Sequence, residues 1–198
     1  MAYSSHTNRM KNAFLIGKKI YLRALENSDL SNLVRWLSDE NVTRNLQQGD
    51  RPPTLEILKE AYDVEGTNPN QIPFAVIDKK TNKHVGWTGL FEISWISRYA
   101  DMRIFVGEKK FWGKGLATES QKLVIEYGFD KLNLHRITAG TSASCMGEQK
   151  ALKKLYMKHE GTSKEAMYRN GKYYDTVHFG IIKQDYQKLV KNGKWKKL

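Results

Sequence analysis

The sequence predicts an α+β fold with a mixed, mostly antiparallel seven-stranded sheet flanked by about four helices. Three observations support this prediction. Stretches of strand-like alternation are interspersed with stretches whose apolar residues recur at helical spacing. A length of 198 residues with 40% apolar residues fits one domain with a sizeable core. Only one strand–helix–strand passage, across Gly113, is of the kind that pairs two strands in parallel.

The first half of the chain predicts one strand, two helices and three further strands. Alternating apolar residues predict the strands, and hairpin turns join the last three. Leucines at helical spacing predict the helices, with Asn27 or Ser28 as the N-cap candidate of the first and Thr54 as that of the second. The expected ranges are strand 19–25, helices 30–37 and 55–64, and strands 72–78, 84–93 and 99–106.

The second half predicts a helix, a strand, a second helix and a final hairpin. Gly113-Lys-Gly115 opens the first of these helices, and Asn170-Gly171 is the strongest hairpin signal in the sequence. The expected ranges are helix 116–129, strand 135–139, helix 149–158 and strands 162–169 and 173–182.

Charge is the most unusual property of the composition. The formal net charge is +12, and much of it lies at the two ends. We expect a polar basic leader (1–16), a single domain (17–187) and a lysine-rich tail (188–198). Lysine-rich ends without interleaved arginine and aromatic residues are a weak nucleic-acid signal, so contact with nucleic acid is expected only indirectly.

Several classes of protein are disfavoured by composition. Cys145 is the single cysteine, which excludes an intramolecular disulfide framework, and the five histidines show no metal-ligand spacing. No apolar stretch approaches the ~18–20 residues of a membrane span, and the start lacks the apolar core of a secretory signal. We expect a cytoplasmic protein without a bound metal.

The segment Phe111-Trp-Gly-Lys-Gly-Leu-Ala-Thr-Glu119 carries the most chemical information. Its glycines permit a tight turn that exposes consecutive N–H groups at a helix N-terminus, which is an anion site suited to a pyrophosphate. Lys109, Lys110 and Lys114 would screen phosphate charge. The segment matches neither a Walker P-loop nor G-x-G-x-x-G.

In context, this segment resembles the acetyl-CoA loop of the GCN5-related N-acetyltransferase (GNAT) superfamily. The family pattern Arg/Gln-x-x-Gly-x-Gly/Ala maps onto Trp112, Gly115 and Ala117, with tryptophan in place of the usual Arg/Gln. Trp-Gly-Lys-Gly-x-Ala is the form common in the ribosomal-protein (RimJ/RimL-type) branch, which the opening Ile-Tyr-Leu-Arg-Ala-Leu and the closing Tyr-Arg-Asn-Gly-Lys-Tyr-Tyr-Asp175 also resemble. The resemblance covers residues 17–187.

The resemblance implies direct attack of an acceptor amine on acetyl-CoA in a ternary complex. In the family the fourth and fifth strands splay apart, and the cofactor's amides pair with the free strand edge. An alkylamine with a pKa near ~10.4 is almost entirely protonated at pH 7, so a base should assist. The residues implied in acetyl-CoA binding are Ile104, Phe105, Val106, Trp112, Gly113, Lys114, Gly115, Leu116, Ala117, Thr118 and Gln149.

The same resemblance implies three catalytic candidates. Tyr156 stands in the tyrosine position of the pattern Asn-x-x-Ala/Ser-x-x-x-Tyr, where it would protonate the departing thiolate, and Gln149 replaces the asparagine. After the tyrosine the family runs x-Lys-x-Gly-Phe, and in this alignment the chain lacks about four residues including Gly-Phe. The base, acting directly or through water, is expected to be Asp101, with Glu92 as the rival.

The acceptor is the least determined part of the prediction. Enzymes for polyamines should line the acceptor cleft with carboxylates, which a net charge of +12 disfavours. We therefore expect a protein N-terminus of the ribosomal type, with a nucleotide-linked amino sugar as the alternative. A CoA- or RNA-binding module that has lost catalysis remains open. The protein is expected to be a monomer or a homodimer.

Overall fold

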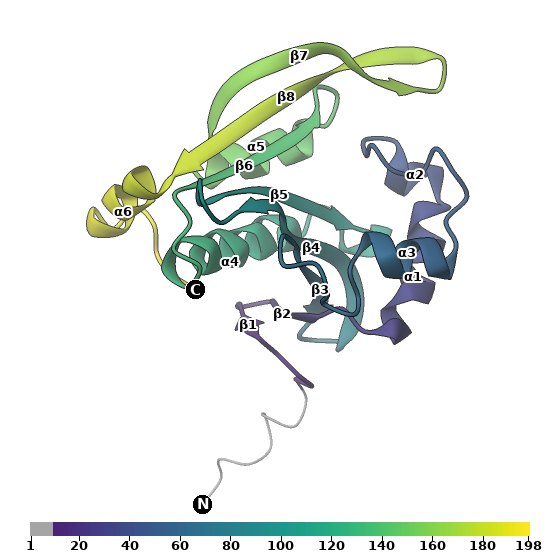
Figure 1. Cartoon of the computed structure of the whole chain (residues 1–198), viewed down its shortest axis with the longest axis horizontal. Coiled ribbons are helices and arrows are strands. Elements are labelled where there is room, and N and C mark those ends of the chain that lie inside the picture. The colour runs from purple at the N-terminus through teal and green to yellow at the C-terminus, as the bar shows by residue number, and fades with distance from the viewer. Residues whose placement is uncertain (1–9) are drawn as a thin grey trace, which may run out of the picture.

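The computed structural model describes residues 10–198, and in this part of the chain eight strands form one mixed sheet (Figure 1). The strand order is β1-β2-β3-β4-β5-β6-β8-β7, and only β5 with β6 is parallel. The strands are β1 Leu15–Ile16, β2 Ile20–Ala24, β3 Ile72–Asp78, β4 Lys83–Ser94, β5 Tyr99–Val106, β6 Arg136–Ser142, β7 Lys158–Arg169 and β8 Lys172–Ile182. The mostly antiparallel sheet is confirmed, with β1 as the eighth strand.

Six α-helices are present among residues 10–198, where about four were expected. They are α1 Leu30–Leu37, α2 Glu40–Thr43, α3 Leu55–Ala61, α4 Leu116–Asp130, α5 Met146–Lys154 and α6 Lys183–Lys191. The additional helices are the four-residue α2, which Asp39 caps through the Asn41 N–H, and α6 in the lysine-rich C-terminal segment. Helix α5 ends four residues before its expected end, so β7 begins earlier than expected.

The sheet buries both of its faces, so its central strands are apolar on both sides. In β3, Phe74 and Val76 join one core with helices α4 and α5. Their neighbours Ala75 and Ile77 join a second core with α1 and α3. This alternation follows from the two-residue period of a strand, and it fixes the register of the sheet against two helical layers.

The splay between β5 and β6 positions the site. The two strands pair only from Tyr99↔Arg136 to Asp101↔Thr138, although β5 continues to Val106 and β6 to Ser142. Beyond Asp101 the edge of β5 that faces β6 therefore has no strand partner. The predicted cleft between these strands, the fourth and fifth of the expected order, is confirmed.

The lysine-rich C-terminal segment packs onto the domain. Trp195 is only 4% exposed, and its Nε1 donates to Glu126 Oε1 on helix α4 at 2.8 Å. It also packs edge-on against Tyr186 of helix α6. The division at residue 187 is therefore not a structural boundary. At the other end, β1 belongs to the sheet, and residues 1–9 of the expected leader lie outside the described residues.

Candidate active site

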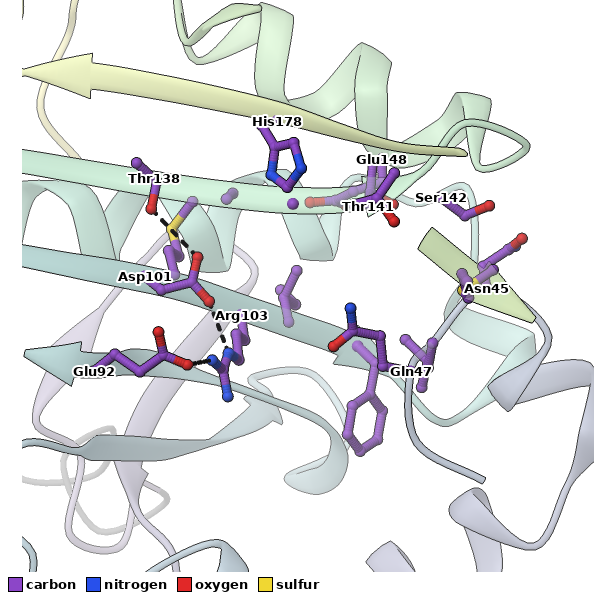
Figure 2. A pocket seen from close by; sticks show the side chains of 18 of the residues that line it. Asn45, Gln47, Glu92, Asp101, Arg103, Thr138, Thr141, Ser142, Glu148 and His178 are labelled. Atoms are coloured by element: carbon purple, nitrogen blue, oxygen red, sulfur yellow. Dashed lines mark hydrogen bonds and ion pairs between the residues drawn. The ribbon is translucent and has the colours of Figure 1, made fainter. Parts of the chain in front are cut away.

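A cavity of about 480 Å³ occupies the space where β5 and β6 part (Figure 2). Side chains of β4 and β5 line one side of it, and side chains of β6, α5 and β8 line the other. The segment 45–48, which follows α2, lies across one end. The cavity is therefore built by the strand splay together with the C-terminal hairpin and a loop from the N-terminal half.

The β5 side of the cavity holds a carboxylate–guanidinium cluster. Asp101 Oδ2 accepts from Arg103 Nε at 2.7 Å, and Arg103 also pairs with Glu92 on β4 (Figure 2). Thr138 on β6 donates to Asp101 Oδ1 at 3.3 Å. Burial raises the pKa of Asp101 above its usual range, although the Arg103 charge opposes that rise. The structure thus brings both base candidates, Asp101 and Glu92, onto one arginine.

A third carboxylate, Glu148, lines the cavity from helix α5 (Figure 2). It accepts a hydrogen bond from Gln121 Nε2 on helix α4, and no cationic side chain pairs with it among the described residues. Burial raises the pKa of Glu148 to about 7. At neutral pH this group is therefore able both to accept and to release a proton.

The glycine turn leads from β5 into helix α4 as expected. Gly113 and Gly115 have φ values of +71° and +80°, the left-handed conformation that favours glycine. Gly115 is the N-cap of α4, and the first hydrogen bond of the helix runs from the Glu119 N–H to the Gly115 carbonyl. The N–H groups of Leu116, Ala117 and Thr118 therefore have no partner within the helix, which is the arrangement that binds anions.

Positive charge gathers beside this turn. A second cavity, of about 1090 Å³, includes Gly113 in its lining together with a set of lysines from the β1–β2 turn, the β3–β4 turn and the segment before α4. These lysines are Lys18, Lys19, Lys79, Lys80, Lys110 and Lys114. None of the six forms an ion pair within residues 10–198. Lys109, by contrast, pairs with Asp39 at 2.6 Å and is not part of this lining.

The other residues expected to bind acetyl-CoA lie on β5, beside the glycine turn and on helix α5. Ile104 and Phe105 line the 480 Å³ cavity. Val106 accepts a hydrogen bond through its carbonyl from Trp112 Nε1 at 2.6 Å, so Trp112 fastens the glycine turn to the end of β5. Gln149 Nε2 donates to the Ala143 carbonyl at 2.8 Å. That contact holds the segment that leads into helix α5.

The placement of Tyr156 on a helix is wrong. Helix α5 ends in a Schellman motif: the Met157 N–H bonds to the Leu152 carbonyl at 3.1 Å, and the Tyr156 N–H to the Lys153 carbonyl at 3.0 Å. Tyr156 occupies the left-handed position of this motif, with φ +58°. Its hydroxyl bonds to the Lys194 carbonyl at 3.4 Å, and the residue is not part of the cavity lining.

This motif also shows that the helix end lacks no residues. Tyr156 and Met157 take the places of glycine and phenylalanine in x-Lys-x-Gly-Phe, with Lys154 as the lysine of that pattern. The tyrosine position of the pattern then falls on Leu152, which is completely buried. A tyrosine thus stands where the pattern has glycine, four residues after the position that the pattern gives to tyrosine.

Sequence reasoning missed several side chains of the cavity, above all Glu148 and His178. An acidic residue in the first turn of a helix is common for electrostatic reasons, so the position of Glu148 in the sequence gives no functional signal. His178 lies mid-strand in β8, where Ser163 Oγ is 2.9 Å from its Nε2. Only the packing of α5 against α4, and of β8 against β6, brings both to the cavity.

Among residues 10–198 no helix is long and apolar enough to cross a membrane. Within the same residues, no three histidine, cysteine, aspartate or glutamate side chains gather in a group suited to a metal ion.

Comparison with known proteins agrees with the fold and the cleft. The family model described as "Acetyltransferase (GNAT) domain" matches residues 19–158, so the chain belongs to the GNAT family of N-acetyltransferases, whose acetyl donor is acetyl-CoA. The uncharacterized N-acetyltransferase p20 of Bacillus licheniformis is 27% identical, over 87% of this chain and 97% of that protein.

Two further relatives have named acceptors. Spermidine N(1)-acetyltransferase of Escherichia coli (strain K12) is 26% identical, over 84% of this chain and 88% of that protein. The crystal structure of spermidine N-acetyltransferase from Vibrio cholerae in complex with CoA and spermine has a TM-score of 0.78 at 25% identity. The match covers 86% of this chain and 99% of the Vibrio cholerae chain.

Proposed function

We propose that this acetyltransferase modifies a primary amine of a small molecule that carries at least one further positive charge. The observation behind the proposal is the charge of the cavity between β5 and β6. Four carboxylates line it, those of Glu92, Asp101, Glu148 and Glu160. The two guanidinium groups of the lining, Arg103 and Arg136, are both already paired with these carboxylates.

The net charge of +12 gave the opposite expectation, because it suggested a cleft that repels polycations. Six lysines of the described chain gather instead around the second cavity, beside the glycine turn. The local field at a site depends on nearby charges much more than on the total, since salt screens charges beyond ~8 Å. The carboxylate-lined cleft that a polyamine enzyme should have is therefore compatible with a strongly basic chain.

We assign the phosphates of acetyl-CoA to the glycine turn. The free N–H groups at the start of α4 and the neighbouring lysines Lys110 and Lys114 supply donors and positive charge. The free edge of β5, with Ile104, Phe105 and Val106, extends from this turn toward Asp101 and supports pairing with the amides of the pantetheine arm. The thioester would then lie at the carboxylate-lined cavity.

The proposal is tested by CoA-thiol release with matched amines. Spermidine, an alkyl monoamine of similar length, a ribosomal-type N-terminal peptide and a nucleotide-linked amino sugar are compared at equal ionic strength. We expect kcat/KM for spermidine to exceed that of the monoamine at least ~10-fold, which corresponds to ~1.4 kcal/mol from a second cation. A preference for the peptide or the sugar would show that the protein-N-terminus or amino-sugar assignment is the correct one.

A further inference from the structure

We propose that Glu148 carries the proton that acetyl transfer must move, from the acceptor amine to the departing CoA thiolate. The proposal rests on the proposed function, because it assumes that the amine is acetylated in the cavity between β5 and β6. It assigns to helix α5 a catalytic group that the sequence pattern does not predict. Three features of the site support it: the partners of Glu148, the buried glutamine behind it and the apolar residue one turn away.

The first feature is the absence of a cation beside Glu148. Every other carboxylate of the cavity lining is paired within the described residues: Glu92 and Asp101 with Arg103, and Glu160 with Arg136. His178 is held by Ser163. A guanidinium partner opposes the rise in pKa that burial causes, as Arg103 does at Asp101, whereas the partner of Glu148, Gln121, is neutral. Burial accordingly raises the pKa of Glu148 to about 7.

The second feature is Gln121, which is 0% exposed on helix α4. Its Nε2 donates to Glu148 Oε1, while its own Oε1 is buried with no partner in the described part of the chain. Turning the amide by half a revolution would offer Oε1 as an acceptor to a protonated Glu148. Gln121 is thus able to satisfy both the carboxylate and the carboxylic acid, as a group that gains and loses a proton requires.

The third feature is the face of helix α5. Leu152 lies one turn after Glu148 and is completely buried in the apolar core. Residues four positions apart lie on the same face of a helix. The next residue on the face that carries Glu148 is therefore a leucine, which cannot donate a proton. Tyr156, the expected acid, bonds to the Lys194 carbonyl outside the cavity lining.

The proposed step balances as follows. The Glu148 carboxylate takes one proton from the bound ammonium group, and the freed amine nitrogen attacks the thioester carbonyl carbon. A C–N bond forms, the C–S bond breaks, and the electron pair of the C–S bond remains on sulfur. Protonated Glu148 then delivers its proton to that sulfur. The nitrogen loses its second proton to solvent as the amide forms. This one proton released to water accounts for the positive charge that the ammonium group loses.

The proposal predicts a specific pH profile of kcat/KM for spermidine. The reactive form of the wild-type complex has Glu148 as a carboxylate and the substrate amine as an ammonium ion. The value of kcat/KM therefore rises with pH up to about 7 and is level from there to pH 9. In Glu148→Gln the amine must lose its proton to water. The rate at pH 7.5 should fall by ~10²–10⁴, and kcat/KM should continue to rise up to pH 9 without levelling.

The matched control is Glu126→Gln. Glu126 lies on helix α4, burial also raises its pKa, and it bonds to Trp195 rather than lining the cavity. This variant should keep the wild-type profile. Glu148→Asp retains a carboxylate, so it should recover part of the rate and the levelling. It keeps the test valid if Glu148→Gln fails to fold, which thermal unfolding reports.

The outcomes separate this proposal from the proposed function. An active wild type with an unchanged Glu148→Gln profile would overturn the role of Glu148 and leave the proposed function intact. A variant that raises only the KM for spermidine, with the levelling near pH 7 retained, would make Glu148 a binding group and also overturn the proposal. Wild-type protein that releases no thiol with any amine would contradict the proposed function itself, and with it the proton transfer.

Discussion

Tyr156 holds a backbone conformation that a glycine adopts without strain and a tyrosine does not. The left-handed position at the end of helix α5 satisfies the last carbonyls of the helix, and Leu152 and Met157, whose hydrogen bond closes the motif, are both buried. The tyrosine side chain is 43% exposed and therefore contributes little burial to offset the strain. A sequence motif that reads residue types alone takes this tyrosine for a helical, catalytic one.

Replacing Tyr156 should therefore affect stability and leave catalysis intact. Tyr156→Gly relieves the left-handed strain, so we expect the free energy of unfolding to increase by ~1 kcal/mol. Tyr156→Phe removes only the hydroxyl that bonds Lys194 and should leave kcat within ~2-fold of wild type. Chemical denaturation and thiol release measure the two effects. A fall in kcat of tenfold or more in Tyr156→Phe would return the tyrosine to the catalytic machinery.

Other site residues could be expected from sequence to different extents. Gly113 and Gly115 were predictable because only a turn that needs left-handed backbone places two glycines directly before a helix. Asp101 was identified through a family resemblance, and its contacts with Arg103 and Thr138 became visible only in three dimensions. Glu148 was not predictable, because its raised pKa arises from helix packing that no local pattern encodes.

At the scale of elements, the β7–β8 hairpin lies over the cleft and bonds to the segment at one end of it. The hairpin arches over the region where β5 and β6 part, and its tip reaches toward α2 (Figure 1). Near the tip, Arg169 Nη2 donates to the Leu46 carbonyl at 2.6 Å and to the Gln48 carbonyl at 3.0 Å. Asn170 Nδ2 bonds to Glu40 on α2. The segment 45–48 that closes one end of the cavity is thus held by a strand more than 100 residues later in the chain.

Loss of this contact should weaken acceptor binding more than cofactor binding. Hydrogen bonds from a charged donor contribute about 1.5–3 kcal/mol, so Arg169→Ala should free segment 45–48 and raise the KM for the amine ~10-fold. The KM for acetyl-CoA should change less than ~2-fold, since Arg169 bonds to segment 45–48 and not to the glycine turn. Lys172→Ala, across the same turn, is the control. Equal changes in both KM values, or none, would show that the hairpin does not hold the acceptor end of the cavity.

The elements themselves were largely predictable where they are long. The helix expected at residues 116–129 is α4 at Leu116–Asp130, and the Asn170-Gly171 hairpin joins β7 to β8 as expected. The nine-residue α6 is an exception, since it was not expected. The two-residue β1 and four-residue α2 were missed because such short segments have no periodicity to detect. They exist because tertiary packing, rather than local propensity, supplies their stability.

At the scale of the whole molecule, net charge and local charge have separate meanings. The lysines beside the glycine turn and the carboxylates between β5 and β6 lie at two different cavities. The C-terminal lysines belong to a segment anchored by Trp195 and α6 rather than to a free tail. A composition sums these groups into a single number, so it predicts neither the anion site nor the acidic cleft.

The most direct test of this account is amide hydrogen exchange with and without CoA. If the cofactor lies along the free edge of β5 and on the glycine turn, exchange should slow at least ~10-fold for residues 104–106 and 113–118, because bound amides are protected from solvent. The amides of β7 and β1, which lie at the outer edges of the sheet, should keep their rates. Unchanged exchange at 104–106 and 113–118, with protection at another surface, would contradict the assignment of the cleft as the site of acetyl transfer.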